Sequence, residues 1–241
     1  MNYYAVICTR DTSSLDKTAW DLLNYYSAGG FQVHIIGGAH SIFHAYNAKV
    51  KELDPDDDDV FVFCHDDIGI SERVDYLKER LNQVLNYQDT GFVGVAGTTH
   101  LGTEAVWWNQ VQWQAGKHRG CVWHKDKDGQ PYKTTYGDQG EVVVMDGLFM
   151  ACTGKTAQMM DFSKPEFFEG EWDFYDIYYC AEARKLGLKN RVMNLEIIHN
   201  SRGELVGRDS WHKNREAFIA NYDLPMIVEK EDAANRGWEQ R

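Results

Sequence analysis

Apolar runs that suit strands alternate with helix-type patterns through the first hundred residues. Four short runs of β-branched and aromatic residues predict strands, at residues 4–8, 31–36, 60–64 and 91–96. Between them, apolar residues spaced three and four apart predict helices, at about residues 13–28, 41–53 and 71–86. Strands and helices that alternate with short connections predict a parallel sheet with helices on both faces.

The regular alternation stops after Gly97. Residues 98–140 are rich in Trp, Gly, His and Lys, and they carry a turn signal at Asp128-Gly129. They predict an irregular or hairpin-containing excursion over one face, and long structured loops of this kind are usually functional. Later patterns predict strands at 141–145, 148–152 and 191–198 and helices at 174–186 and 209–222.

The chain is long enough for one large domain. It has 241 residues, of which 43% are hydrophobic, and neither an internal repeat nor an interdomain linker interrupts it. We expect a single α/β domain over residues 1–241 with a mainly parallel central sheet. Its parts would be residues 1–97, residues 98–222 and a charged, loose tail at 223–241.

Charge excludes one class of function. The chain has 25 Lys and Arg against 37 Asp and Glu, which gives a net charge of −12. A protein that binds nucleic-acid backbones without sequence preference needs the opposite balance, so we do not expect that activity. A local basic groove stays possible, because net charge does not describe how the basic residues are distributed.

The sequence also indicates a compartment. It contains no apolar run of membrane-spanning length and no basic start followed by an apolar stretch. The five cysteines are odd in number and widely spaced, which is typical of buried free thiols. We therefore expect a cytoplasmic protein without a membrane span.

The most informative stretch is His65-Asp66-Asp67, directly after the predicted strand at 60–64. Ligands of open α/β sheets bind at the carboxyl ends of the strands. Magnesium and manganese are commonly held there by one or two carboxylates together with substrate phosphates. This pattern favours a metal site, and an ordinary acidic turn is the alternative.

A series of short motifs follows one another along the chain: Ala45-Tyr46-Asn47-Ala48, His65-Asp66-Asp67-Ile68, Val95-Ala96-Gly97, Trp107-Trp108, Val144-Met145-Asp146-Gly147-Leu148-Phe149, Phe174-Tyr175-Asp176-Ile177 and His199-Asn200-Ser201. Their order and spacing resemble GT-A glycosyltransferases of the family 2 type, over roughly residues 3–222. The chain is most similar to the glycosyltransferase-like group related to a streptomycin-biosynthesis protein. The resemblance implies a GT-A fold with a Rossmann-like nucleotide-binding half and an acceptor-binding half.

The resemblance also implies a nucleotide-sugar donor, favouring a UDP-sugar, and a divalent Mn or Mg ion. His65-Asp66-Asp67 stands at the family's DxD position, with His65 where the family has an acid. Asp67 is then the expected metal ligand, His65 and Asp66 lie near the donor, and His199 would complete the metal site.

Asp176 is the expected catalytic base. Inverting transfer needs a carboxylate that removes the acceptor hydroxyl proton, and Asp176 aligns with the base of the family. Asp173 stands where the family has the first acid of a pair, and we assign it to the acceptor side, with a helix cap as the alternative. Tyr178 occupies a position where relatives often carry another acid.

Other residues are expected to bind the two substrates. For the donor these are Thr9, Arg10 and Asp11 at the end of the first strand, Asn47, and Asp146-Gly147, where a glycine lets the backbone come close. For the acceptor they are Trp107 and Trp108, whose rings suit stacking on a sugar or a base. Core packing is the alternative for both tryptophans.

The leading hypothesis is a metal-dependent hexosyl- or pentosyltransferase that acts on an acceptor hydroxyl, and the resemblance implies the inverting type. The acceptor would be a glycan, a small molecule or a hydroxymethylated base in DNA. The alternative is a non-catalytic module that binds nucleotide-sugars or glycans and keeps the fold. The sequence leaves the donor sugar, the acceptor and the oligomeric state open.

Overall fold

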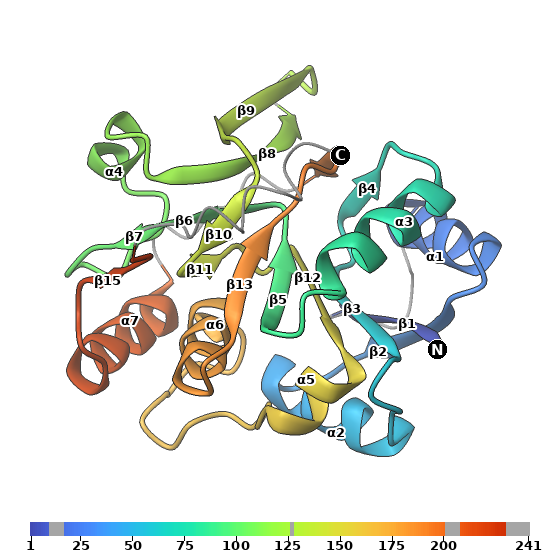
Figure 1. The fold of residues 1–241 in the computed structure, drawn as a ribbon, viewed down its shortest axis with the longest axis horizontal. Coiled ribbons are helices and arrows are strands. Elements are labelled where there is room, and N and C mark those ends of the chain that lie inside the picture. Colours follow the sequence, from blue (N-terminus) through green and yellow to red (C-terminus); the bar gives the residue numbers. More distant parts are fainter. Residues whose placement is uncertain (10–16, 126–127, 201–207, 230–241) are drawn as a thin grey trace.

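The computed structural model describes residues 1–9, 17–125, 128–200 and 208–229. Its strands form a seven-stranded sheet, a six-stranded sheet and a two-stranded pair (Figure 1). The strands are β1 Tyr3–Thr9, β2 Gln32–Gly37, β3 Val60–His65, β4 Ile68–Ile70, β5 Thr90–Gly94, β6 Ala96–Thr98, β7 His100–Leu101, β8 His118–Lys125, β9 Pro131–Gly137, β10 Gly140–Val142, β11 Val144–Met145, β12 Phe149–Thr153, β13 Lys189–Val192, β14 Ile197–His199 and β15 Met226–Ile227.

Five of the helices in the described residues lie near the places that the periodicity predicts, whereas it does not predict the short helices at 110–114 and 154–159. The helices are α1 Lys17–Ala28, α2 Ile42–Leu53, α3 Val74–Leu85, α4 Gln110–Gln114, α5 Gly154–Met159, α6 Tyr175–Lys185 and α7 Asp209–Asn221. Ser41 caps α2, since its side chain accepts a hydrogen bond from the backbone N–H of His44. Within the described residues, none of these helices combines the length and the apolar character that a bilayer crossing requires.

The seven-stranded sheet has the order β10-β13-β5-β12-β3-β1-β2. The pairings give one direction to β1, β2, β3, β5 and β13 and the opposite direction to β10 and β12. The expected α/β fold with a mainly parallel sheet is therefore confirmed, with the antiparallel strand β12 inside it.

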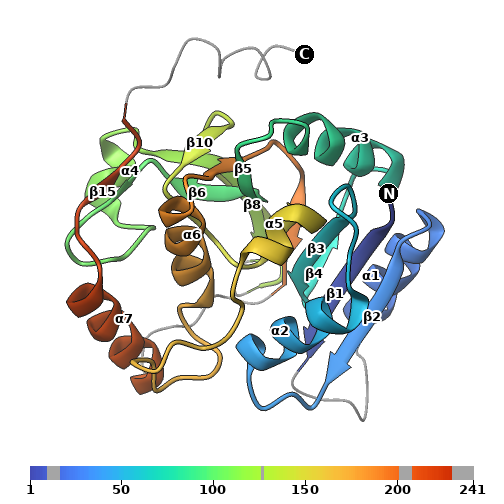
Figure 2. The ribbon, with the colours of Figure 1, turned by 60° about the horizontal axis from the view of Figure 1, so that its bottom comes forward.

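Helices cover both faces of this sheet (Figure 2). Neighbouring residues of a strand point to opposite faces, and Phe63 and Cys64 are neighbours on β3. The ring of Tyr46 on α2 lies 4.7 Å from that of Phe63, whereas the hydroxyl of Tyr26 on α1 donates to the sulfur of Cys64. The α1 helix and the α2 helix thus lie on opposite sides of β3.

Three predicted strands divide between the two large sheets. The chain passes from the seven-stranded sheet to the six-stranded one between β5 and β6, and again between β13 and β14. It does the same between β10 and β11. The predictions of continuous strands at 91–96, 141–145 and 191–198 are wrong for this reason. Val95, between β5 and β6, and Val143, between β10 and β11, are fully buried, so the hydrophobic runs there show no break. At the crossing after β13, the buried Met193 and Leu195 alternate with polar residues as in a strand.

The excursion after Gly97 is more regular than its composition indicates. It holds the short helix α4 and a hairpin of β8 and β9, and the hairpin turn includes the predicted Asp128-Gly129. Figure 1 shows the hairpin projecting from one end of the molecule. Its strand β8 joins β6 and β14 in the six-stranded sheet, whose order is β11-β6-β8-β14-β4.

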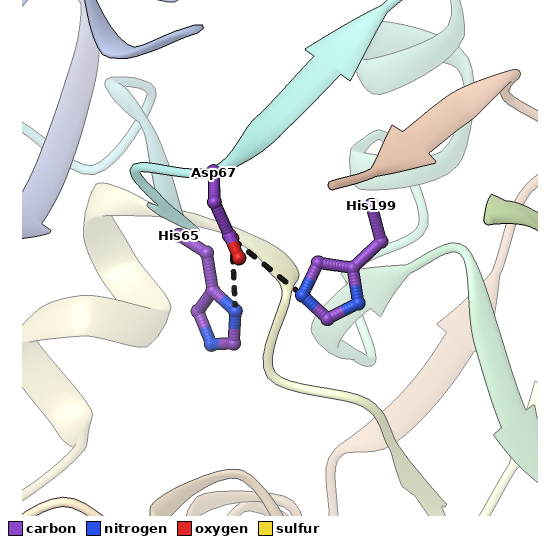
Figure 3. Close-up of side chains that lie close together, drawn as sticks. All are labelled: His65, Asp67 and His199. Carbon is purple, nitrogen blue, oxygen red and sulfur yellow. Dashed lines mark ion pairs between the residues drawn. The ribbon is translucent and has the colours of Figure 1, made fainter. Parts of the chain in front are cut away.

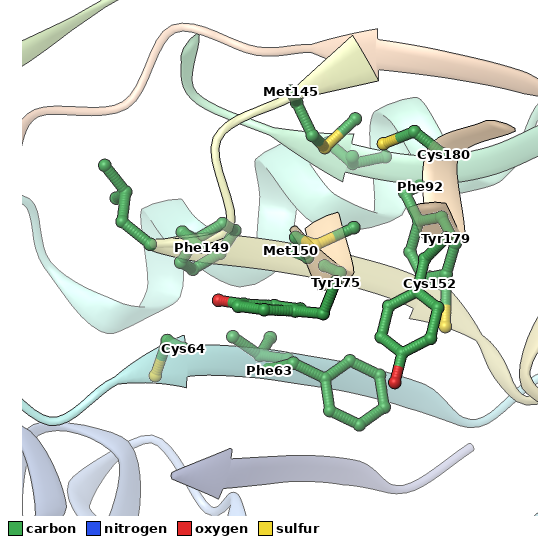
Figure 4. Packing of buried hydrophobic residues seen from close by; sticks show 14 of the residues in the cluster. Phe63, Cys64, Phe92, Met145, Phe149, Met150, Cys152, Tyr175, Tyr179 and Cys180 are labelled. Carbon is green, nitrogen blue, oxygen red and sulfur yellow. The ribbon is translucent and has the colours of Figure 1, made fainter. Parts of the chain in front are cut away.

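One hydrophobic cluster underlies both sheets. It includes side chains of β1 and β3 from the larger sheet, β11 from the smaller one, and α6 (Figure 4). The five cysteines are all free thiols and all buried, as predicted.

Candidate functional site

His65, Asp67 and His199 gather where β3 ends (Figure 3). His65 is the last residue of β3, and Asp67 directly precedes β4. The antiparallel pairing of β4 with β14 places His199 opposite Ile68, and so beside Asp67. Asn200 fixes the turn, because its backbone N–H and its side-chain amide both donate to the carbonyl oxygen of Asp67 at 2.9 Å.

The geometry of these three side chains suits one bound ion. Their ligand atoms all lie within 4.8 Å of one another. The Oδ1 atom of Asp67 is 3.8 Å from Nδ1 of His65 and 3.5 Å from Nε2 of His199. The side chains of His65 and Asp67 are about a third exposed, so a ligand can reach the cluster from solvent.

The charges around the cluster favour a cation. Burial lowers the pKa of His199, but its hydrogen bond and charge attraction to Asp67 outweigh burial and raise that pKa overall. Burial and the neighbouring His199 lower the pKa of His65, so its ring is neutral and able to bind a metal at physiological pH. Two imidazoles and one carboxylate are a donor set that suits divalent transition-metal ions.

Asp176 lies in the first turn of α6 and is held by backbone donors. Its Oδ2 atom accepts from the N–H of Gly147, and its Oδ1 atom accepts from the N–H of Ile177, both at 2.9 Å. Burial and the nearby charge of Asp146 nevertheless raise the pKa of Asp176 to about 7. A carboxylate with a pKa near neutrality is suited to general-base catalysis.

Gly147 allows this arrangement because it has no side chain. A Cβ atom there would lie 2.6 Å from Cζ of Tyr175 and 2.9 Å from Cβ of Asp176, closer than real Cβ contacts. Its N–H bonds Asp176, and its carbonyl oxygen accepts from the hydroxyl of Tyr175 at 2.9 Å. Gly147 therefore joins the α6 helix to the turn between β11 and β12.

The remaining donor-side residues are spread around this edge of the sheet. Thr9 is buried at the end of β1, next to Cys8, which pairs with His65. Asp66 is half-buried in the turn beside Asp67, and Asp146 precedes Gly147 with its Oδ1 atom accepting from Leu148 at 3.0 Å.

Of the other residues expected on the donor side, one has a partner on another segment and two lie outside the described residues. Asn47 is on α2, where its amide donates to Oγ of Ser163 at 2.9 Å, so the structure gives it a partner in the chain after α5. Arg10 and Asp11 lie outside the described residues.

The two acceptor-side tryptophans differ in exposure. Trp107 is 2% exposed and packs edge-on against Trp108 and Tyr136, so its ring is part of the core beneath the excursion after Gly97. Trp108 is 37% exposed, and its ring centroid lies 5.6 Å from that of Trp211 on α7. Trp108 is thus the member of the pair that solvent reaches.

Asp173 connects α7 to the start of α6. Its carboxylate accepts from Oγ of Ser210 at 2.6 Å and lies 3.3 Å from the guanidinium of Arg208. The residue that precedes α6 is Phe174, in a left-handed conformation, and its side chain makes no capping hydrogen bond. Asp173 is therefore not the helix cap that was the alternative interpretation.

Sequence reasoning gave no role to Tyr175. Its hydroxyl lies 2.9 Å from Nε2 of His65, so it links a candidate metal ligand to the segment that holds Asp176. The only signal in the sequence is its place directly before Asp176. Tyr178, by contrast, points into an aromatic cluster with Phe43 and Phe168, and adds no group to the site.

Comparison with known proteins identifies the family. The sequence matches the family model described as "Glycosyltransferase like family" over residues 5–222. The chain belongs to this glycosyltransferase-like family. The match confirms the predicted resemblance and the predicted class of enzyme, a glycosyltransferase. A search of curated proteins gives no significant match.

One solved structure supports the GT-A fold of this glycosyltransferase-like chain. GalNAc-T7, in a crystal structure with UDP, GalNAc and Mn²⁺, is similar with a TM-score of 0.53 and 10% sequence identity. That alignment covers 91% of this chain and 48% of the other, so the chain spans about half the length of GalNAc-T7. A197 from STIV is 13% identical with a TM-score of 0.48, and the alignment covers 83% of this chain and 85% of A197.

Proposed function

We propose that the protein is a manganese-dependent, inverting glycosyltransferase that takes its sugar from a UDP-sugar. One observation carries the proposal: the His65, Asp67 and His199 cluster lies at the end of β3, and Gly147 connects this edge to the raised-pKa carboxylate of Asp176. Inverting transfer from a nucleotide-sugar can use both groups, the cation for the leaving diphosphate and the carboxylate for the proton of the acceptor.

The donor set favours Mn²⁺ over Mg²⁺. Mg²⁺ prefers an all-oxygen octahedral shell, whereas a first-row transition-metal ion such as Mn²⁺ accepts imidazole nitrogen together with carboxylate and phosphate oxygens. His65, Asp67 and His199 would supply two nitrogens and one oxygen, which leaves positions for the donor's phosphates. The Mn²⁺ and UDP in the structure of GalNAc-T7 support the same choice of ion and nucleotide.

When bound, the ion would neutralise the charge that develops on the departing nucleoside diphosphate. The chain's own residues do the rest. Asp176, ionised above a pH of about 7, accepts the proton of the acceptor hydroxyl as its oxygen attacks the anomeric carbon. The N–H of Gly147 keeps the carboxylate in place during this transfer.

The acceptor is a hydroxyl-bearing glycan, small molecule or modified base of DNA. Trp108, on the excursion between β7 and β8, offers the exposed ring on which such a group would stack. The basic character of this region is reduced, because Lys133 forms an ion pair with Glu196. Among these acceptors, this favours a neutral glycan or small molecule over DNA, which is a polyanion.

A transfer assay tests the proposal. Release of nucleoside diphosphate from a panel of nucleotide-sugars is measured with Mn²⁺ and with Mg²⁺, for the wild-type protein and for Asp67→Asn. We expect turnover with one UDP-sugar that needs Mn²⁺ and is lost in the variant. A donor that binds without turnover under any condition would instead support a non-catalytic binding module.

A further inference from the structure

Tyr175 is a buried tyrosine whose hydroxyl contacts two groups of the site. It is 5% exposed, its ring packs against that of Tyr46 on α2, and its hydroxyl points toward the end of β3 (Figure 4). The hydroxyl oxygen is 2.9 Å from Nε2 of His65 and 2.9 Å from the carbonyl oxygen of Gly147. Both contacts are within hydrogen-bond distance.

The number of protons available determines which atom donates in each of the two hydrogen bonds of the Tyr175 hydroxyl. A carbonyl oxygen only accepts, so the single proton of the Tyr175 hydroxyl must lie toward Gly147. The hydroxyl oxygen then has only lone pairs to offer to His65. The Nε2 atom of His65 must therefore carry a proton and donate it.

We propose that Tyr175 is a positioning residue that holds neutral His65 in the Nε2–H form, with the lone pair of Nδ1 directed at the cation site. The Nδ1 atom is the one that faces Asp67, at 3.8 Å. This assignment rests on the proposed function for the identity of the ion. A hydrogen bond to the far nitrogen of a metal-binding histidine is a common way to fix the ring and its tautomer.

The same residue links the ion to the base. The peptide segment at Gly147 accepts from Tyr175 through its oxygen and donates to Asp176 through its nitrogen. Tyr175 and Asp176 are also neighbours at the start of α6. Removing the hydroxyl would thus loosen the ligand His65 without removing any ligand or the base.

Tyr46 provides a matched control. It is 1% exposed, and its ring centroid lies 6.1 Å from that of Tyr175. Within the part of the chain that the structure describes, its hydroxyl has no hydrogen-bond partner. Tyr46→Phe therefore removes the same atom from the same aromatic neighbourhood without breaking the link to His65.

The first test reads the tautomer in the metal-free full chain. Nitrogen-15 NMR of the imidazoles, with His65 assigned by loss of its signals in His65→Gln, reports which ring nitrogen carries the proton. We expect the Nε2–H form in the wild type and in Tyr46→Phe, and a mixture of tautomers in Tyr175→Phe. An Nδ1–H form in the wild type would overturn the assignment, even where Tyr175→Phe fails to fold.

The second test measures Mn²⁺ affinity by electron paramagnetic resonance. We expect Tyr175→Phe to bind Mn²⁺ about 10 to 100 times more weakly than the wild type, and Tyr46→Phe to bind like the wild type. Equal affinity in all three would overturn the positioning role. A wild type that binds no Mn²⁺, but whose His65 tautomer depends on Tyr175, would contradict the proposed metal site and support the tautomer assignment.

Discussion

At the scale of single residues, the site contains one pair of groups that attract each other and one pair of like charge. His199 and Asp67 attract each other, whereas Asp176 is buried beside a second carboxylate, Asp146, that opposes its ionisation. Groups whose pKa values are shifted from their ordinary values cluster at functional sites, because catalysis requires pKa values matched to the reaction. The raised pKa of Asp176 predicts two pH dependences, one of activity and one of stability.

The first concerns activity. Replacing Asp176 by Asn removes the proton acceptor, and general-base catalysis contributes about 10² to 10⁴ in rate. We expect Asp176→Asn to lose turnover by about that factor while it still binds the donor. In the wild type, kcat/KM should rise with pH and level off above a pH of about 7. Measurement of kcat/KM against pH checks this, and a profile that is flat through neutrality would contradict the role of Asp176.

The second concerns stability. The folded-state pKa of Asp176, about 7, is above its ordinary value of 3.8, so the folded protein keeps a proton that the unfolded chain has lost. The stabilising contribution of this proton is complete below about pH 4 and disappears as pH rises through about 7. Denaturant titrations should show wild-type stability falling relative to Asp176→Asn across this range. If the difference in unfolding free energy between the wild type and Asp176→Asn does not change with pH, the raised pKa of Asp176 is contradicted.

Gly147 gives a steric prediction. A Cβ atom there meets Tyr175 and Asp176 at less than 3 Å, so we expect Gly147→Ala to lose about 1 to 3 kcal/mol of unfolding free energy and most of the activity. Gly69→Ala is the control, because a Cβ atom at Gly69 would have nothing within 4 Å. Chemical denaturation and turnover of both variants check this. Equal behaviour of the two variants would show that the turn at Gly147 is not tightly packed.

The sequence predicts the members of the site better than their connections. The family resemblance implies that His65, Asp67 and His199 lie at the donor and metal site, and the structure brings these three side chains together. The role of Tyr175 does not follow, since a tyrosine at the start of a helix is most simply a core residue. Its hydroxyl acquires a function only through the fold, which places His65 and Gly147 on either side of it.

At the scale of elements, the sequence predicts where strands occur but not which sheet they join. Local periodicity reports burial, and residues are equally buried on both sides of a crossing between sheets. The crossings at Val95 and Val143 therefore leave no trace in the pattern. The short strand β4 and the hairpin of β8 and β9 belong to the second sheet, which is built from pairings between distant segments.

The contact between α7 and the segment before α6 is also an element-scale feature. Asn214 on α7 is fully buried. Its side-chain oxygen accepts from the backbone N–H of Gly170, and its side-chain NH₂ donates to the carbonyl oxygens of Gly170 and Asp173. We expect Asn214→Ala to cost about 2 to 3 kcal/mol, because buried backbone groups lose their partners. The exposed Asn221→Ala should cost less than about 0.5 kcal/mol. Urea titration compares them, and equal costs would show that Asn214 does not anchor α7.

At the scale of the whole molecule, the two sheets meet at the site. Asp67 and His199 flank strands of the smaller sheet, His65 ends a strand of the larger one, and Asp176 starts the helix that packs beside both. A single hydrophobic cluster lies beneath both sheets. The protein has a net charge of −12, which repels an anionic diphosphate. A cation bound at the proposed site would offset this repulsion locally and attract the diphosphate.

Donor binding tests the central claim most directly. The melting temperature of the wild type and of Asp67→Ala is measured with a panel of nucleotide-sugars, each with Mn²⁺, with Mg²⁺ or without a divalent ion. A ligand that binds the folded state raises stability by an amount set by its concentration relative to Kd. We expect one UDP-sugar to raise the melting temperature of the wild type only with a divalent ion, more with Mn²⁺ than with Mg²⁺, and not at all in Asp67→Ala. A panel in which no donor shifts the wild type with either ion, or in which Asp67→Ala responds equally, would contradict a metal-dependent nucleotide-sugar site.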